Sequence, residues 1–244
     1  MRNLVVIPAY NEEAALARTV QRLDSLPEPY ELLIVNDGST DRTGFIADNL
    51  ARLAARRIHV VHLPMNCGIG VAVQTGYLFA TKAGGYRYVI QFDGDGQHDA
   101  RYVEQMVQAC EERQLDLCLG SRFLSGSTHS DRSTWTRRLG IHFFARLISL
   151  LSGTAVTDPT SGFRCAGPRA WSRFAGRYPE DYPEPESLFW LLRNRLRIGE
   201  IPVRMHRRQG GVSSIRSLRS VYYMLKVSLA ILFDWARARE RLER

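Results

Sequence analysis

The 244-residue sequence contains no apolar run that approaches the ~20 residues of a membrane-spanning helix. Its N-terminus predicts no signal peptide, because the polar run Asn11-Glu12-Glu13 directly follows a short apolar segment. Cysteine is scarce, and no pair has the Cys-x-x-Cys spacing of a zinc or redox site. We therefore expect reduced thiols in a cytosolic protein. The cysteines are Cys67, Cys110, Cys118 and Cys165.

Glycine is missing where a dinucleotide-dependent dehydrogenase needs it. That class carries Gly-x-Gly-x-x-Gly directly after its first strand, and the segment from Pro8 to Asn11 contains no glycine. Acidic residues are scarce near the C-terminus. From Arg193 onward there are 13 Lys and Arg but only 4 Asp and Glu. This part has a net charge of +9, and the rest of the chain has a net charge of −1. This excess predicts either an anionic partner, such as a membrane surface, phosphate group or nucleic acid, or a solvated charged face.

Short apolar segments alternate with amphipathic segments along the chain. This alternation predicts βα units and therefore an α/β fold with a mainly parallel central sheet and flanking helices. The predicted strands cover residues 4–7, 31–35, 58–63, 86–92, 115–119 and 198–203. The predicted helices cover about 11–26, 41–56, 69–82, 99–113, 134–151, 187–196 and 215–241.

Polar clusters follow three of the predicted strands directly. They are Pro8 to Glu12, Asn36 to Ser39 and Asp93 to Gln97. Ligands of parallel α/β sheets bind beyond the carboxyl ends of the strands, so we expect these clusters to share one rim. A nucleic-acid-binding module would explain the basic C-terminal part but not this rim, and we expect no nucleic acid partner.

Asp93 and Asp95 flank a glycine at the end of a predicted strand. A turn at Gly94 allows both carboxylates to converge on one hard cation. Mg²⁺ and Mn²⁺ take such oxygen ligands, often together with the oxygens of a bound phosphate. The alternative is a solvated acidic turn, but the preceding strand and the two companion clusters favour a metal site.

Two further segments predict contacts with a nucleotide. Asp37 lies in a turn after a strand, where its carboxylate can accept hydrogen bonds from a base or a ribose, or can cap the next helix. The segment Asn66-Cys-Gly-Ile-Gly70 is similar to a phosphate-binding glycine loop, although Gly76 comes too late for the full motif. It predicts a tight turn into a helix.

Several motifs together resemble family 2 glycosyltransferases, in particular the dolichol-phosphate mannose synthase branch and its bacterial polyprenyl-phosphate relatives. The resemblance covers roughly residues 3–215. It is carried by Val6-Ile-Pro-Ala-Tyr-Asn-Glu12, Ile34-Val-Asn-Asp-Gly-Ser-Thr-Asp41, Asn66-Cys-Gly-Ile-Gly70, Phe92-Asp-Gly-Asp-Gly-Gln-His98, Gly120-Ser-Arg122, Asp158-Pro-Thr-Ser-Gly-Phe-Arg164 and Arg208-Gln-Gly-Gly-Val-Ser213.

The resemblance implies a Rossmann-like GT-A fold, a nucleotide-diphosphate sugar donor, Mg²⁺ or Mn²⁺, and inversion at the anomeric carbon. It implies that Asp93, Asp95 and Gln97 bind the metal and that Arg122 and Arg208 contact phosphates. Asp95 and Asp158 would then lie at the reaction centre. The donor-binding residues that it implies are Pro8, Ala9, Tyr10, Glu12, Val35, Asp37, Asp93, Gly94 and Asp95.

Two positions depart from the family pattern. The mannose synthases carry a lysine where this chain has Ser214, and the glycine loop often carries a basic residue where this chain has Ile69. Arg207 or Arg216 could replace the missing cation. These departures concern the identity of the donor and the binding of the acceptor phosphate, not the metal site.

The acceptor determines whether a general base is needed. A polyprenyl phosphate is already ionised, whereas a sugar hydroxyl of a glycan must lose its proton to a carboxylate. The sequence offers Asp158, with the best family support, and also Asp181, Glu184 and Glu186. The last three could equally form the N-terminal turn of the following helix, where acidic side chains are favoured.

The C-terminal helix is expected to divide the chain into a glycosyltransferase domain, residues 1–214, and an amphipathic helix, residues 215–244. Its apolar segment Val221 to Phe233 is short and has arginines on both sides, which predicts a helix lying in a membrane interface. The apolar side of helix 134–151 could add to this surface. The alternatives are packing on the core or on a partner, either a second copy or a membrane protein. We expect a cytoplasmic protein held peripherally at the inner face of the membrane.

Overall fold

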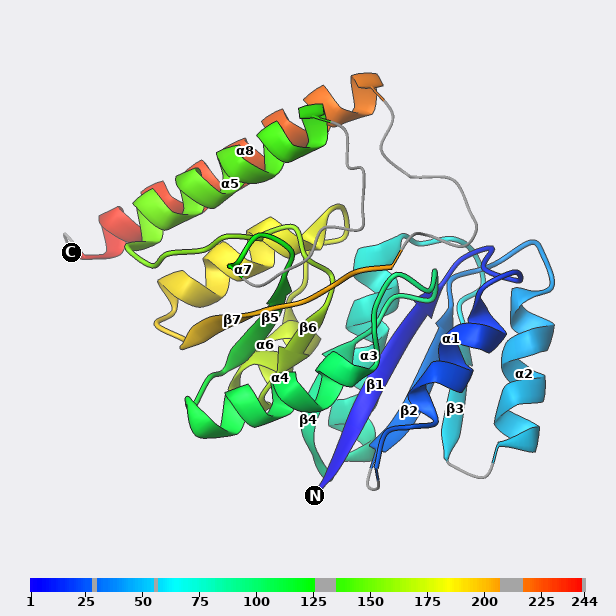
Figure 1. The fold of residues 1–244 in the computed structure, drawn as a ribbon. Helices are drawn as coiled ribbons and strands as arrows, with labels where there is room; N and C mark the ends of the chain where they lie inside the picture. The colour runs from blue at the N-terminus through cyan, green and yellow to red at the C-terminus, as the bar shows by residue number, and fades with distance from the viewer. Residues whose placement is uncertain (28–29, 55–56, 126–134, 207–216, 243–244) are drawn as a thin grey trace.

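The computed structural model describes residues 1–27, 30–54, 57–125, 135–206 and 217–242. Within them lies a seven-stranded sheet with the strand order β3-β2-β1-β4-β6-β5-β7 (Figure 1). All neighbouring strands are parallel except β6, which is antiparallel to β4 and β5. The strands are β1 (Arg2–Ala9), β2 (Tyr30–Asn36), β3 (Ile58–His62), β4 (Tyr86–Gln91), β5 (Leu117–Ser121), β6 (Arg164–Ala166) and β7 (Ile198–Pro202).

The helices cover both faces of the sheet and complete the predicted α/β architecture. The described helices are α1 (Leu16–Leu23), α2 (Thr43–Leu53), α3 (Ile69–Ala83), α4 (Arg101–Glu112), α5 (Trp135–Ser152), α6 (Pro168–Gly176), α7 (Pro183–Arg193) and α8 (Ser217–Leu242). Successive strand residues point to opposite faces. Val5 and Ile7 of β1 therefore pack with α1, α2 and α4, whereas Leu4 and Val6 pack with α3, α6 and α7.

The predicted rim exists because β1, β2 and β4 are parallel neighbours in close register. Pro8 is paired with Val35, and Val6 is paired with Gln91. The three polar clusters consequently leave the sheet at the same edge. Backbone hydrogen bonds continue beyond the strands, since Asp37 N–H donates to the Ala9 carbonyl at 2.9 Å.

Some element boundaries differ from those expected. Helix α1 begins at Leu16 rather than at Asn11, because Asn11 has a left-handed backbone (φ 53°) and its side chain bonds the next rim loop. Helix α7 begins at Pro183, before the expected position 187, since proline is well suited to the first helical turn. Strand β6 and helix α6 were not predicted.

Helices α5 and α8 lie side by side, run in the same direction, and cover α7 beyond the carboxyl edge of the sheet (Figure 1). Helix α8 contributes Val227 and Ile231 to the core, with 2% and 0% of their surface exposed. Gly140 of α5 faces the sulfur of Met224. The proposed division at residue 215 stays a prediction, although α8 shares the hydrophobic core with the rest of the fold.

Candidate active site

Asp37 organises the glycine loop at the rim. Its buried carboxylate accepts hydrogen bonds from the backbone N–H groups of Cys67 at 2.8 Å and Gly68 at 2.9 Å. The loop comes so close that a Cβ atom on Gly38 would lie 2.2 Å from the carbonyl carbon of Met65, and Gly38 also has a positive φ of 61°. Asp37 therefore connects the end of β2 to the start of α3, whatever else it binds.

The glycine loop is also packed against the segment before α7. A Cβ atom on Gly70 would lie 2.2 Å from the carbonyl oxygen of Pro179, and Gly70 N–H donates to the Glu180 carbonyl at 3.2 Å. Ile69 at the start of α3 is 39% exposed. The loop thus has a fixed shape that is determined from both sides.

The loops after β1 and β2 are joined by hydrogen bonds. Asn11 N–H donates to Ser39 Oγ at 3.0 Å, Thr40 N–H donates to Asn11 Oδ1 at 2.9 Å, and Glu12 N–H donates to Thr43 Oγ1 at 2.8 Å. The predicted donor-binding residues share this region but differ in exposure. Tyr10 is 43% exposed, and the others are buried: Pro8, Ala9, Glu12 and Val35.

The Asp93-Gly-Asp95 turn lies beside the end of β1, since Gly94 N–H donates to the Pro8 carbonyl at 3.3 Å. Asp95 is 8% exposed, and its Oδ1 accepts the backbone N–H of Gln97 at 3.0 Å. The side chain of Asp93 is 33% exposed. The amide nitrogen of Gln97 points toward the carbonyl of His206 at 3.5 Å.

His98 supports this turn from behind. Its Nδ1 accepts the backbone N–H of Asp93 at 3.1 Å, so the other ring nitrogen carries the proton in the neutral form and lies 3.6 Å from Asp93 Oδ2. The imidazole stacks on Phe163 with 4.6 Å between ring centroids and meets Phe92 edge-on. Burial lowers the pKa of His98 to about 4, which keeps the ring neutral near pH 7.

The two carboxylates fit a divalent cation that arrives together with a diphosphate. Carboxylate oxygens are the ligands that Mg²⁺ and Mn²⁺ prefer, and such sites commonly use one or two carboxylates plus substrate phosphates. Gly162 leaves space at Asp93, because a Cβ atom there would lie 3.0 Å from Asp93 Oδ2. Among the described residues, no group of three or more His, Cys, Asp or Glu side chains could hold a metal alone.

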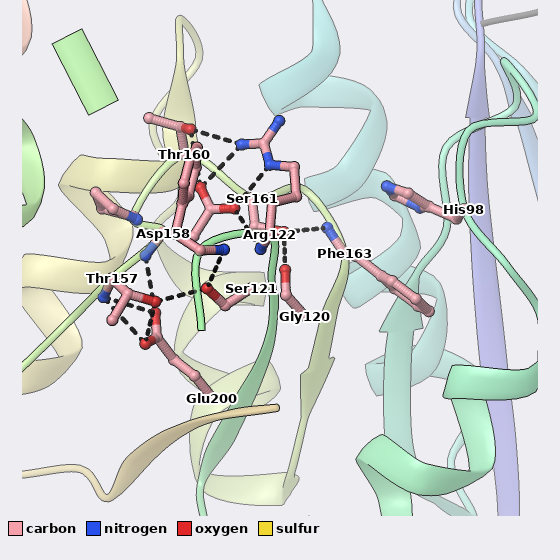
Figure 2. A network of polar contacts seen from close by, with 12 residues as sticks. His98, Gly120, Ser121, Arg122, Thr157, Asp158, Thr160, Ser161, Phe163 and Glu200 are labelled. Carbon is pink, nitrogen blue, oxygen red and sulfur yellow. Dashed lines mark hydrogen bonds and ion pairs between the residues drawn. The ribbon is translucent and has the colours of Figure 1, made fainter. Parts of the chain in front are cut away.

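Arg122, which is partly buried, and Asp158, which is fully buried, form a bidentate ion pair (Figure 2). Arg122 Nε donates to Asp158 Oδ2 at 2.7 Å, and Nη2 donates to Oδ1 at 2.8 Å and to Thr160 Oγ1 at 3.0 Å. The side chain of Asp158 is 0% exposed, whereas that of Arg122 is 14% exposed. A carboxylate held on both oxygens by one guanidinium is better suited to orienting that group than to accepting a proton.

The candidate bases Asp181, Glu184 and Glu186, which lie before and within α7, have different neighbours. Asp181 is exposed and lies 2.6 Å from Lys226 Nζ of α8. Glu184 interacts electrostatically with Arg164, Asp93 and Arg122, and burial raises its pKa while Arg164 opposes the rise. Burial also raises the pKa of Glu186, but the charges around that carboxyl are those of Arg177, Asp234 and Lys226. Among these three carboxyl groups, Glu184 is the one associated with the rim.

Arg164 is the last residue of the Asp158 to Arg164 motif, and the sequence alone suggested no role for it. It is 0% exposed and donates to the carbonyls of Pro159, Ser161 and Glu184 and to Ser187 Oγ. The guanidinium therefore joins the loop after Asp158 to the first turn of α7. Sequence reasoning also gave no role to His98 and Glu200. Glu200 was missed because its partners Thr157 and Asp158 are distant in sequence, and the stacking of His98 on Phe163 is equally non-local.

The predicted phosphate residue Arg208 lies outside the described residues, as do Arg207, Ser214 and Arg216. The chain reaches them from His206, whose N–H donates to the Gln97 carbonyl at 2.7 Å. The role predicted for Arg208 stays a prediction.

Comparison with known proteins agrees with the motifs. Residues 4–174 match the model described as "Glycosyl transferase family 2". The chain is 30% identical over 247 residues to polyprenol monophosphomannose synthase of Mycolicibacterium smegmatis, covering 100% of this chain and 89% of that protein. It is 34% identical over 167 residues to undecaprenyl-phosphate mannosyltransferase of Micrococcus luteus, covering 67% of this chain and 65% of that protein.

Solved structures agree on the fold. Glucosyl-3-phosphoglycerate synthase from Mycobacterium tuberculosis, in complex with Mn²⁺, UDP-glucose and phosphoglyceric acid, superposes with a TM-score of 0.69 and 20% sequence identity. The match covers 96% of this chain and 80% of that one. The predicted GT-A architecture is thereby confirmed.

Proposed function

The chain belongs to glycosyl transferase family 2 and is a glycosyltransferase, and we propose that it transfers a sugar from a nucleotide-diphosphate donor to a polyprenyl phosphate with inversion at the anomeric carbon. The observation that carries the choice of acceptor is the ion pair between Asp158 and Arg122. The carboxylate that the family resemblance places near the reaction centre is already occupied by a guanidinium. An acceptor that is ionised from the outset needs no base there.

The donor is proposed to bind along the carboxyl edge of β1, β2 and β4. Asp37 and the loop that it holds would receive the nucleoside, as Tyr10 and Glu12 would from the β1 side. Asp93 and Asp95 would hold Mg²⁺ or Mn²⁺, with Gln97 adjacent. Bound there, the cation would neutralise the negative charge that develops on the leaving diphosphate.

Arg122 is proposed to bind a phosphate, either of the acceptor or of the donor. Its forked N–H donors suit phosphate oxygens, and its partial exposure leaves it accessible from the rim. Asp158 and Thr160 would fix the plane of the guanidinium before the substrate arrives. An orientation fixed in advance lowers the ordering cost of binding.

A second acceptor class is supported by Glu184. Burial raises the pKa of this carboxyl group, and a base with a raised pKa is better able to take a proton from a sugar hydroxyl. In that case the product would be a glycosidic bond in a lipid-linked or surface glycan. The two acceptors differ in the stability of the product, because a sugar phosphodiester is cleaved by mild acid and a glycosidic bond is not.

We further propose that helices α5 and α8 rest on the cytoplasmic face of the membrane. None of the helices in the described ranges has the length and hydropathy to cross a bilayer. Both helices nevertheless expose large apolar side chains, and both lie beyond the carboxyl edge of the sheet, on the side of the rim (Figure 1). The exposed residues are Leu139, Phe143 and Leu150 of α5 and Tyr222, Leu225, Leu229, Leu232 and Phe233 of α8.

The experiment that tests the proposed transfer is a donor screen. Nucleotide sugars are incubated with the protein and Mn²⁺ or Mg²⁺, with and without polyprenyl phosphate, and released nucleotide is measured. We expect release from one donor to rise when polyprenyl phosphate is added. Equal release with and without the lipid phosphate, for every donor, would contradict the proposal.

A further inference from the structure

Glu200 on β7 holds the loop that contains Asp158. Its carboxylate accepts the backbone N–H of Thr157 at 3.0 Å and that of Asp158 at 3.0 Å, and it also accepts the Thr157 hydroxyl at 2.8 Å. Two successive backbone N–H groups and one hydroxyl therefore converge on one partly buried carboxylate. Figure 2 shows Thr157 between Glu200 and the Asp158–Arg122 pair.

The other end of the ion pair is attached to the same part of the sheet. Strand β5 ends at Ser121, directly before Arg122, and it lies beside β7 with Leu119 paired to Glu200. Ser121 Oγ lies 2.5 Å from Thr157 Oγ1. Ser161 Oγ donates to the Gly120 carbonyl at 2.7 Å. The loop from Thr157 to Ser161 is thus bonded to both β5 and β7.

The carboxylate of Glu200 accepts its hydrogen bonds from Thr157 and Asp158, so its energetic role lies in the loop. Burial raises the pKa of this carboxyl group, as does the nearby charge of Asp158, and the hydrogen bonds from Asp158 and Thr157 oppose the rise. Two carboxylates placed this close repel each other. The arrangement is favourable only because Arg122 compensates Asp158 while the backbone N–H groups compensate Glu200.

We propose that Glu200 is a positioning residue, which holds the backbone of Thr157 and Asp158 where Asp158 can orient the guanidinium of Arg122. The use of Arg122 for phosphate rests on the proposed function, but the positioning itself does not. Glu200→Gln tests the positioning role. An amide keeps one acceptor oxygen, but its NH₂ group would face backbone N–H groups that are also donors, so those bonds are lost.

The matched control is Asp116→Asn. Asp116 is a similarly buried carboxylate, 8% exposed, at the other end of the β5–β7 pair, and it accepts the backbone N–H of Arg197 at 2.8 Å. Loss of this bond should affect stability without reaching Arg122. Thr157→Val is a milder second variant, since it removes the hydroxyl donor to Glu200, together with the contact of that hydroxyl with Ser121 Oγ, and keeps the backbone N–H groups.

The first measurement is hydrogen exchange of the Arg122 Nε–H by ¹⁵N NMR, with the signal identified by its absence in Arg122→Lys. We expect exchange to be slow in the wild type and in Asp116→Asn. It should be faster by at least about tenfold in Glu200→Gln, the factor that corresponds to roughly one lost hydrogen bond. The exchange rate in Thr157→Val should lie between those of the wild type and Glu200→Gln. This variant provides the test if Glu200→Gln does not fold. Exchange as slow as in the wild type would overturn the proposal if it is seen in folded Glu200→Gln or, where that variant does not fold, in Thr157→Val.

The second measurement is kcat/KM for transfer, with Glu200→Gln made in the wild type and in Arg122→Lys. A positioning role predicts that Glu200→Gln lowers kcat/KM in the wild type but has almost no further effect once Arg122 is lysine, because lysine cannot form the bidentate pair. Equal losses in both backgrounds would indicate a purely structural role. If the wild type transfers no sugar, the proposed function fails, and the exchange measurement still decides the role of Glu200.

Discussion

The exposed apolar face of α8 allows a quantitative test of membrane contact. We consider the triple variant Leu225→Ser, Leu229→Ser and Phe233→Ser, whose wild-type side chains are 61%, 51% and 66% exposed. Complete burial of such a side chain is worth about 1.5–3 kcal/mol, so covering the exposed part is worth about 1–1.5 kcal/mol each. The three changes should therefore weaken partitioning into vesicles by about 3–4.5 kcal/mol, or about two to three orders of magnitude.

The assay is co-sedimentation with vesicles that contain anionic lipid, over a range of lipid concentrations. The matched control has one phenylalanine and two leucines on the opposite part of the molecule: Phe45→Ser and Leu53→Ser on α2 and Leu78→Ser on α3, which are 56%, 85% and 43% exposed. Ile231 must be left intact, because it is 0% exposed and Ile231→Ser would damage the core instead.

We expect the α8 variant to stay folded, to lose vesicle binding and to keep nucleotide binding, while the control variant sediments like the wild type. Sedimentation of the folded α8 variant at the wild-type lipid concentration would refute the membrane contact. Loss of self-association instead of vesicle binding would show that the face contacts a second copy of the chain.

Three further predictions concern single side chains. Asp95→Asn should remove most activity with a nearly unchanged melting temperature, because this rim carboxylate contributes little to the core; full turnover of the variant, or of the wild type in EDTA, would contradict the metal site. Asp37→Ala should weaken nucleoside-diphosphate binding measured by calorimetry and cost about 1–3 kcal/mol of stability, because two loop N–H groups lose their acceptor. Equal affinity in that variant would show that neither Asp37 nor its loop contacts the donor. Glu31→Gln should reduce the loss of stability that the wild type shows at acid pH. Burial raises the pKa of Glu31, but hydrogen bonds from Tyr86, His59 and Arg2 outweigh this effect and leave the pKa below 4.5. The ionised Glu31 therefore contributes to the free energy of unfolding above pH 4.5, and this contribution is lost as pH falls through the lower folded-state pKa. If the melting temperatures of wild type and variant fall in parallel below pH 4.5, the prediction is refuted.

The parts of the fold that were predicted correctly have strong local signals. Strands β1, β2 and β4 each contain at least three consecutive apolar residues, as expected for strands buried on both faces, and each is followed by a polar cluster. Strand β6 was missed because it has only three residues and begins with a charged one, Arg164. Its charge is compatible with burial because four oxygen acceptors surround it, two from the adjoining loop and two from α7. The acceptors from α7 are about 20 residues away, and no local sequence pattern predicts them.

The same distinction applies to the site. The rim positions of Asp37, Asp93 and Asp95 follow from where the parallel strands end, so the sequence was sufficient to place them. The pairing of Arg122 with Asp158 and the support from Glu200 depend on segments that are 36 and 42 residues apart. For α8, the apolar pattern predicted an amphipathic helix, but only the packing showed that Ile231 faces the core and Leu229 faces outward.

Identification of the product tests the proposed transfer most directly. A nucleotide sugar labelled in the sugar is incubated with the wild-type protein, polyprenyl phosphate and Mn²⁺, and the lipid phase is extracted and treated with mild acid. We predict that label enters the lipid phase only when polyprenyl phosphate is present, and that mild acid releases it as free sugar. Label that enters a lipid or glycan product but resists mild acid, or label transfer that does not depend on polyprenyl phosphate, would contradict the assignment of a lipid phosphate as the acceptor.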